Sequence, residues 1–364
     1  MIFHLLLLSS AVCHPRDGGF TRCAYNDWTV NSLPPRERPT ELIDRFGRVI
    51  RDLRISVTPR CNYHCTYCDP LGESHPEPRG VLSVRDVDNF VRASALLGLD
   101  AARFTGGEPL LRKELPEMMA NAKDTPGVKD IALTTNGTLF RRRHKELLEA
   151  GLNRVNISLD AIDGNVFRQA TGGGDVKVVL DAIDLALELN LHPVKINAVA
   201  IRGINDGEII NMARLSLEKP LHVRFIEYMH LNNSSLDVYN NAFLAGAESK
   251  AMIEREFGPL EVVPVDAASP ARVYKIPGAP GNLGFINPIS EPFCGACSRM
   301  RLTADRKVRP CLLTDRELDA SAAFEAPNPI EAIIDVLLEA AHRKGRMGDI
   351  LPKIRERTMV AIGG

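Results

Sequence analysis

The sequence has few aromatic residues and no excess of either charge. Aromatic side chains make up 5% of its 364 residues, with a single tryptophan, and 45 Lys and Arg residues balance 46 Asp and Glu residues. Proteins dedicated to nucleic acids or anionic membrane surfaces usually carry a large basic excess, and platforms for single-stranded nucleic acid need stacking aromatics. No apolar run reaches the length of a membrane span. We therefore expect no nucleic-acid partner and no membrane partner.

The first forty residues lack the features of an exported or a folded segment. Residues 2–12 are apolar, but no Lys or Arg precedes them, and Val12 before Cys13 makes a poor cleavage site for a secretion signal. Residues 16–40 are rich in proline and show no periodicity. We therefore predict a disordered N-terminal extension, residues 1–41, on a cytoplasmic protein.

Strand-like and helix-like runs alternate from about residue 51. The strand-like runs are 53–58, 101–105, 129–135, 154–160, 194–200 and 221–228. The helix-like stretches between them are about 83–98, 114–124, 141–150, 175–190 and 206–217, with Ser83 and Asp175 at N-cap positions. Strands that alternate with helices form parallel βα units, as in a doubly wound sheet or a TIM-type barrel.

Side-chain alternation within the strands favours the barrel. Leu53 and Arg54 point to opposite faces of the first strand, and Lys195 and Asn197 share one face of the fifth. A central strand of an open parallel sheet is covered on both faces and should be apolar on both, whereas each of these strands has one polar face. We therefore predict an α/β fold with an incomplete (βα)6 barrel of the TIM type over residues 42–230.

The pattern changes after residue 230. A helix-like stretch at 248–257 is followed by residues 258–292, which are rich in Pro and Gly and contain only short apolar runs. We predict a second region, residues 231–364, with a β-rich layer that carries the second of two cysteine groups.

Six of the eight cysteines fall into two groups of three. The first group, C-x3-C-x2-C, follows the first strand, and the two groups are Cys61, Cys65 and Cys68, and Cys294, Cys297 and Cys311. Thiolates at such spacing bind zinc or iron–sulfur clusters. Structural zinc needs four ligands, whereas three cysteines on a cubane cluster leave one iron open to a substrate or cofactor. The groups favour two iron–sulfur clusters, and a zinc-stabilised binding protein is the alternative.

A Gly-Gly-Glu segment follows the second strand. Gly106 and Gly107 let the backbone approach a ligand closely, and Glu108 could accept hydrogen bonds from an ammonium group. One βα unit after the first cysteine group, this segment resembles the radical S-adenosylmethionine (SAM) superfamily. That resemblance implies a 4Fe-4S cluster whose open iron binds SAM.

Further motifs are similar to those of the GTP 3',8-cyclases of molybdenum cofactor biosynthesis, a radical SAM family. They are LRISVTPRCNYHCTYC (53–68), TGGEPLLR (105–112), TTNG (134–137), NISLDA (156–161), RFIEYM (224–229), CGACSRMRLTADRKVRPCL (294–312) and the terminal Gly-Gly, within a resemblance that spans 42–364. It implies a lyase that converts GTP to 3',8-cyclo-7,8-dihydroguanosine triphosphate, the first step of molybdopterin biosynthesis. A SAM-derived radical would take the C3' hydrogen of GTP, and C3' would then attack C8.

The same resemblance implies a role for each matching residue. The first cluster would be held by Cys61, Cys65 and Cys68, and the second, whose open iron binds the guanine ring, by Cys294, Cys297 and Cys311. The expected SAM-binding residues are Tyr67, Gly107, Glu108, Ser158 and Met229. The expected GTP-binding residues are Arg54, Arg103, Thr134, Lys195, Arg224, Arg299, Met300 and Arg301. The double-glycine tail is expected to reach into the active site.

Three departures from the family pattern keep an alternative open. Ala101 stands where many relatives have a second basic residue, Asp69 follows the third cysteine where an apolar residue is usual, and Arg306 replaces the glycine of a T-A-D-G turn. The alternative is a radical SAM enzyme with an auxiliary cluster that acts on a peptide or another small molecule. The expected partners are GTP, an electron donor and a downstream pterin-forming enzyme, and the family is typically homodimeric.

Overall fold

In the computed structural model of the chain, a twelve-stranded sheet carries the fold. Its strand order is β11-β12-β13-β10-β9-β8-β7-β6-β5-β14-β15-β16. All six predicted strands are present, within two residues of their expected bounds, as β5 (Asp52–Ser56), β6 (Ala101–Thr105), β7 (Asp130–Thr135), β8 (Arg154–Ser158), β9 (Lys195–Ala200) and β10 (His222–Glu227). Each is parallel to the next along the chain, as successive βα units require. The predicted parallel α/β architecture is therefore confirmed.

Strands from the C-terminal region extend this sheet at both edges. The strand β13 (Asn282–Ile286) is parallel to β10, and β14 (Arg299–Leu302) is parallel to β5. Antiparallel strands lie outside them, namely β12 (Arg272–Lys275), β11 (Glu261–Val263), β15 (Lys307–Arg309) and β16 (Leu318–Asp319). The expected β-rich layer is thus part of the barrel sheet itself, because the periodicity of a strand does not identify the strand with which it pairs.

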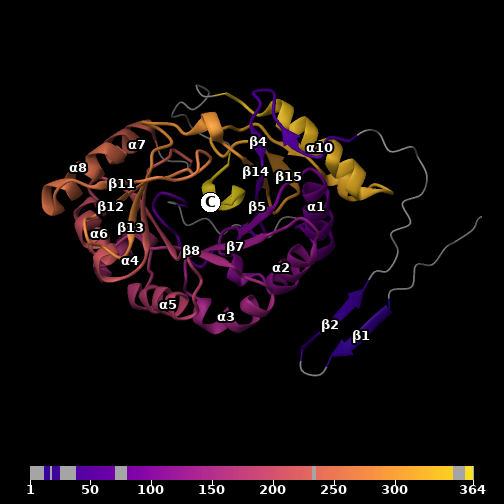
Figure 1. The fold of residues 1–364 in the computed structure, drawn as a ribbon, viewed down its shortest axis with the longest axis horizontal. Helices are drawn as coiled ribbons and strands as arrows, with labels where there is room; N and C mark the ends of the chain where they lie inside the picture. The colour runs from indigo at the N-terminus through magenta and orange to yellow at the C-terminus, as the bar shows by residue number, and fades with distance from the viewer. Residues whose placement is uncertain are drawn as a thin grey trace, which may run out of the picture. The chain divides into compact units, whose positions relative to one another are not determined.

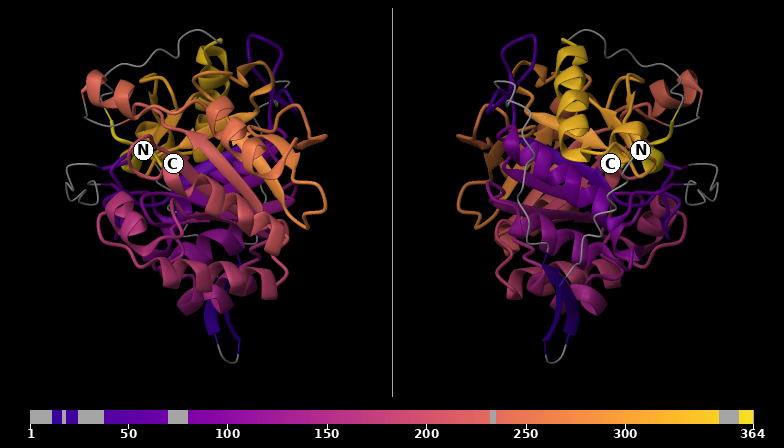
Figure 2. Two further views of the ribbon diagram at one scale, coloured as in Figure 1. Left: turned by 90° about the vertical axis from the view of Figure 1, so that its left-hand side faces the viewer. Right: turned by 90° about the vertical axis from the view of Figure 1, so that its right-hand side faces the viewer.

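Helices from the βα units cover the outer side of the curved sheet, as Figures 1 and 2 show. They are α1 (Val84–Leu96), α2 (Leu115–Asp124), α3 (Phe140–Glu149), α4 (Gly164–Thr171), α5 (Val176–Glu188) and α6 (Ile209–Glu218), with 3-10 turns η1 (Pro109–Leu111) and η2 (Asp206–Glu208). The helix α1 begins where the sequence predicts because Ser83 and Asp86 form a reciprocal capping box. The sequence did not predict α4, which is too short to show a clear helical period.

The C-terminal region also contributes helices. They are α7 (Leu236–Ala242), α8 (Gly246–Phe257), η3 (Cys294–Ala296), α9 (Ser321–Phe324), α10 (Pro329–Arg343) and α11 (Met359–Ile362). The helix α10 packs against α1 and β15. By contrast, α11 lies within the curve of the sheet, at the yellow end of the chain in Figure 1. The last turn of helix is therefore placed where a ligand of the barrel would bind.

The two faces of the central strands differ in polarity as predicted. On β9, Ile196 and Ala198 are buried in the hydrophobic core, while Lys195 and Asn197 line a cavity. On β5, Leu53 is buried and Arg54 lines the same cavity. This alternation follows from the two-residue period of a strand. It places the polar side chains of several strands on one concave surface.

The structure describes residues 12–16, 19–24, 38–69, 80–231, 235–346 and 357–363. Contacts divide the chain into two units, residues 1–39 and 40–364. The first contains an antiparallel hairpin of β1 (Val12–Arg16) and β2 (Gly19–Ala24), within the extension expected to be disordered. In the second, β3 (Leu42–Ile43) pairs with β4 (Val49–Ile50) ahead of the sheet. Among the helices described, none has the length and apolar character needed to cross a membrane.

Candidate active site

A cavity of about 460 Å³ lies on the concave face of the sheet. Side chains from the central strands, both cysteine groups and the C-terminal tail line it. All six predicted metal ligands are among the lining residues, which include Cys61, Cys65, Cys68, Cys294, Cys297 and Cys311. The fold therefore brings two cysteine loops that are far apart in the sequence to the wall of one cavity.

The first cysteine loop is held by the end of α4. The backbone N–H of His64 donates to the Thr171 carbonyl at 3.0 Å, and that of Thr66 donates to the Ala170 carbonyl at 3.0 Å. Gly172 ends the helix at φ +69°, and a Cβ on it would lie 2.7 Å from the His64 carbonyl oxygen. Only glycine combines this conformation with so close an approach. The unpredicted helix α4 is thus the element that shapes the first loop.

The second cysteine group is held by two buried cations. Arg48 donates to the Cys294 carbonyl at 2.8 Å, and Lys344 donates from Nζ to the Arg299 carbonyl at 2.7 Å. Burial acts to raise the pKa of Cys297, but Lys344 and Arg299 outweigh it and lower that pKa. Neither Arg48 nor Lys344 was predicted as a site residue, because a lone cation in a sequence carries no sign of where it folds.

The thiol groups fit iron–sulfur clusters better than zinc. Each loop presents three cysteines. Nowhere in the described part of the chain are three His, Cys, Asp or Glu side chains arranged around a single metal ion. A structural zinc needs four ligands around one ion, whereas thiolates on different irons of a cubane cluster lie farther apart. Three cysteine ligands on such a cluster would leave one iron open to another ligand.

The six predicted cations all line the cavity. They are Arg54, Arg103, Lys195, Arg224, Arg299 and Arg301. The Nε atoms of Arg54, Arg103 and Arg224 are buried and have no hydrogen-bond partner among the described residues. Burial and the neighbouring Arg224 lower the pKa of Lys195 to about 7, and burial and nearby arginines lower the pKa of Arg224 to about 9. Unpaired buried cations are costly, so these side chains fit a ligand with several negative charges.

Two carboxylates offset only part of this positive charge. Asp52 lies 3.7 Å from Arg54 and 3.9 Å from Arg299. Asp130 is already engaged by Arg154, which donates to it from Nε at 2.8 Å. Asp52 and Asp130 are the first residues of β5 and β7, and Asp52 lines the cavity whereas Asp130 is not among its lining residues. Arg103 and Arg224, whose buried Nε atoms have no hydrogen-bond partner among the described residues, are left for a ligand.

Four of the five residues expected at SAM line the cavity. They are Tyr67, Gly107, Ser158 and Met229. The hydroxyl of Tyr67 donates to Asp160 at 2.9 Å. A Cβ on Gly107 would collide with the Arg60 carbonyl, so a close backbone approach requires glycine there. The positions agree with the expected role, which stays a prediction.

Glu108, the fifth of these residues, does not line the cavity. Its fully buried carboxylate accepts hydrogen bonds from the backbone N–H of Leu110 at 2.9 Å and of Asn136 at 2.7 Å, and from the Thr135 hydroxyl at 2.7 Å. Burial raises the pKa of Glu108 to about 7. The carboxylate therefore joins the loops after β6 and β7. This differs from the prediction that Glu108 accepts hydrogen bonds from an ammonium group.

Met300 likewise lies away from the cavity. Its side chain is fully buried in the hydrophobic core, whereas Arg299 and Arg301 on either side of it line the cavity, as does Thr134 on β7. Successive residues of a strand point to opposite faces. The same alternation that places the two arginines could have excluded Met300 from the GTP-binding set.

The three departures from the family pattern each have a structural counterpart. Asp69 is buried, with its carboxylate 3.4 Å from Nδ1 of His64. Ala101 lies opposite Asp52 in the register of β6 and β5, so the cation on β6 that lowers the pKa of Asp52 is Arg103, two residues farther along the strand. Arg306 has φ +63°, the conformation for which glycine is the usual residue.

The C-terminal tail enters the cavity. Val360 lines it, and Arg301 donates to the Gly363 carbonyl at 2.9 Å. Gly363 has φ +78°, and a Cβ on it would lie 2.6 Å from the Cβ of Ser56, so this position requires glycine. The second residue of the predicted double-glycine tail, Gly364, lies outside the described residues.

Comparison with known sequences divides the chain into two matching regions. The profile of the Radical SAM superfamily matches residues 55–216, and that of Molybdenum Cofactor Synthesis C matches residues 221–349. The GTP 3',8-cyclase of Pelotomaculum thermopropionicum is 41% identical over 324 residues, which are 88% of this chain and 99% of the relative. The GTP 3',8-cyclase of Alkaliphilus metalliredigens is 40% identical over 323 residues, again 88% of this chain and 99% of the relative.

Solved structures of lower sequence similarity share the fold. SuiB of Streptococcus suis, bound to S-adenosylmethionine, superposes with a TM-score of 0.54 at 16% identity, over 81% of this chain and 69% of that one. The protein anSMEcpe with bound AdoMet gives a TM-score of 0.53 at 17% identity, over 83% of this chain and 82% of that one. These likenesses show that the chain shares the fold of these proteins, and the match to the Radical SAM profile agrees with a radical SAM partial barrel.

Proposed function

Because the chain belongs to the GTP 3',8-cyclase family of the radical SAM superfamily, we propose that it converts GTP to 3',8-cyclo-7,8-dihydroguanosine triphosphate, the first step of molybdenum cofactor biosynthesis. The observation that carries this proposal is the joint presence, around one cavity, of two three-cysteine loops and six cations, three of which have a buried Nε atom with no hydrogen-bond partner among the described residues. A cluster enzyme without an anionic substrate has no need of those cations.

The two cysteine loops are assigned different cofactor roles. Cys61, Cys65 and Cys68 would hold the 4Fe-4S cluster that binds SAM. Cys294, Cys297 and Cys311 would hold a second 4Fe-4S cluster, and its open iron would face the guanine ring. When bound, the first cluster and SAM supply a carbon radical that can take a hydrogen atom from the ribose. The part of the chain in this chemistry is to hold the reacting groups together and to keep water out.

The cations of the sheet are assigned to the triphosphate. Arginine forks bind phosphate oxygens through two parallel hydrogen bonds, and the buried Nε atoms of Arg54, Arg103 and Arg224 have no other described partner. Lys195 adds a single point charge beside them. Because β14 places Arg299 and Arg301 next to the second cysteine group, base and phosphates would be held by neighbouring parts of one wall.

The partners and boundaries that the comparisons leave open belong to the same proposal. GTP is the substrate, an electron donor supplies the reducing equivalents, and a downstream pterin-forming enzyme takes the product. The chain would form a homodimer. Each protomer would consist of an N-terminal extension over 1–41, a barrel over 42–230 and a second region over 231–364. Contacts place the last two regions in one unit.

An anaerobic assay tests the proposed function. The clusters are reconstituted, SAM, dithionite and GTP are added, and 5'-deoxyadenosine and nucleotide products are followed by mass spectrometry. We expect 5'-deoxyadenosine together with a cyclic nucleotide of the same mass as GTP. If 5'-deoxyadenosine forms while GTP is untouched, the GTP cyclase proposal is refuted, and the substrate is another molecule.

A further inference from the structure

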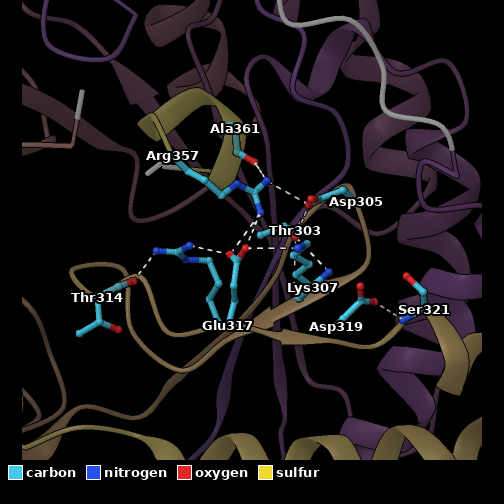
Figure 3. Close-up of polar contacts among 10 residues, drawn as sticks. Thr303, Asp305, Lys307, Thr314, Glu317, Asp319, Ser321, Arg357 and Ala361 are labelled. Carbon is cyan, nitrogen blue, oxygen red and sulfur yellow. Dashed lines mark hydrogen bonds and ion pairs between the residues drawn. The ribbon is translucent and has the colours of Figure 1, made fainter. Parts of the chain in front are cut away.

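One arginine anchors the C-terminal tail outside the cavity (Figure 3). Arg357 donates to Asp305 Oδ1 at 3.0 Å, to both carboxylate oxygens of Glu317 at 3.2 Å, and to the Ala361 carbonyl at 3.0 Å. A planar guanidinium suits such multiple contacts. The single side chain therefore links α11 to the turn between β14 and β15 and to the loop ahead of β16.

The acidic half of this network is held without help from the tail. The Thr303 hydroxyl donates to Asp305 at 2.6 Å, and Arg309, whose side chain is 2% exposed, donates to Glu317 at 2.6 Å. The side chains of Arg357 and both acids are only about one-fifth to one-quarter exposed, so salt screens these pairs less than it screens pairs in open solvent. The carboxylates are thus preformed and oriented toward the arginine.

From this anchor the chain enters the active site within one helical turn. Val360 lines the cavity, and the Gly363 carbonyl accepts from Arg301. We propose that Arg357, held by Asp305 and Glu317, is a positioning residue that fixes the tail across the cavity during turnover. This inference rests on the proposed GTP reaction, since the tail then closes the site that holds GTP. Without the anchor, the tail keeps its contacts inside the cavity and the hydrogen bond from the backbone N–H of Met359 to the Leu231 carbonyl at 2.9 Å.

The test compares Arg357→Met and Arg357→Lys with Arg343→Met in the reconstituted enzyme. Arg343 pairs with Glu339 on the exposed face of α10, so its loss controls for the removal of an Arg–carboxylate pair. Hydrogen exchange of residues 357–363 is measured by mass spectrometry, alongside GTP turnover and SAM cleavage. Loss of charged hydrogen bonds predicts exchange at least about tenfold faster in Arg357→Met. We expect GTP turnover of Arg357→Met to fall by about the same factor, while SAM cleavage without product increases. Arg357→Lys should restore part of the slow exchange and part of the turnover. Arg343→Met should change neither the exchange nor the turnover.

Several results would overturn the proposal. One is unchanged exchange of residues 357–363 in Arg357→Met, and another is faster exchange with turnover and KM for GTP unaltered. If Arg357→Met does not fold, Asp305→Asn removes one charge of the network and must raise exchange of the same segment. A wild-type enzyme that makes no product from GTP refutes the proposed function alone, because tail exchange still reports on the anchor.

Discussion

Lys195 is a group on the cavity wall that changes its charge near neutral pH. Its pKa is lowered to about 7 by burial and by the neighbouring Arg224, so the side chain is charged below about pH 7 and neutral above it. A bound polyanion favours the charged form and raises this pKa, so GTP binding takes up a proton above about pH 7. We expect GTP affinity to fall, by at most about tenfold per pH unit, as pH rises from about 7.

Calorimetry of GTP binding in buffers of different ionisation enthalpy measures this proton uptake directly. Lys195→Arg is the matched variant, because arginine stays charged at every pH used. It should bind GTP and lose the pH dependence. Equal proton uptake by the wild type and Lys195→Arg would show that another group titrates.

The two cysteine groups should separate into two functions. Cys65→Ala removes a ligand from the loop assigned to SAM, so SAM cleavage should be abolished. Cys297→Ala should leave SAM cleavage intact and abolish cyclisation of GTP, since it alters only the loop assigned to guanine. Mass spectrometry of 5'-deoxyadenosine and of the cyclic nucleotide distinguishes the two outcomes. Normal product from Cys297→Ala would contradict this assignment.

Arg306 combines a strained backbone with favourable side-chain contacts. It has φ +63°, and its guanidinium donates to Asp86 at 2.9 Å and to Glu325 at 2.7 Å. Arg306→Gly loses these contacts and relieves the backbone, whereas Arg306→Ala loses them and keeps the strain. We expect the alanine variant to be less stable than the glycine variant by about 1 kcal/mol, measured by urea unfolding. Equal stability would show that the turn carries no strain.

The location of a site residue was predictable from the sequence where strand alternation or the spacing of a motif determines it. The cysteine spacing located the thiols, and strand alternation located cations such as Arg54 and Lys195 on one face. The positions of Arg48 and Lys344 were not predictable, because they depend on contacts with residues far away in the sequence. Glu108 differed from expectation because nearby backbone N–H groups take up its carboxylate.

At the scale of elements, α4 determines the shape of the first cysteine loop. Gly172→Ala places a methyl group against His64. The added Cβ would lie 2.7 Å from the His64 carbonyl oxygen. Gly173→Ala is the matched control, because Gly173 also has a positive φ, +128°, and nothing lies within 4 Å of an added Cβ. We expect Gly172→Ala to lose the iron of one cluster and SAM cleavage together.

The measurement for this pair is iron content per chain with SAM cleavage after reconstitution. Both variants place a non-glycine residue at positive φ, but only Gly172→Ala brings the new methyl group against the loop, so a lower iron content in Gly172→Ala than in Gly173→Ala reports that contact. Equal iron content in the two would mean that the loop adjusts without help from α4.

Elements with a clear period were predicted, and those without one were not. The six central strands and five helices between them follow from alternation of apolar and polar residues. The helix α4 is short, and the strands β13 and β14 have only short apolar runs. Their place in the sheet depends on pairing with β10 and β5, which no local pattern records.

At the scale of the whole molecule, the sheet is completed only by the C-terminal region. The predicted boundary at residue 230 leaves β10 and β5 without their outer partners β13 and β14. Exposed edges of a parallel sheet promote association. We therefore expect a fragment of residues 40–230 to aggregate, and residues 40–364 to unfold cooperatively. Size-exclusion chromatography and chemical denaturation compare the two, and a monomeric fragment that unfolds cooperatively would establish residue 230 as a true domain border.

The position of β14 also has a consequence for the newly made chain. The strands β5 to β10 leave the ribosome before β13 and β14 are synthesised. Until then, both edge strands of the nascent sheet, β5 and β10, lack their outer partners. During that interval the exposed edges of the incomplete sheet need protection from aggregation by chaperones. Slow translation between residues 227 and 299 makes the interval longer. We expect the yield of soluble enzyme to depend on chaperone supply and on the speed of translation between residues 227 and 299. The speed of translation over the first fifty residues should have a smaller effect.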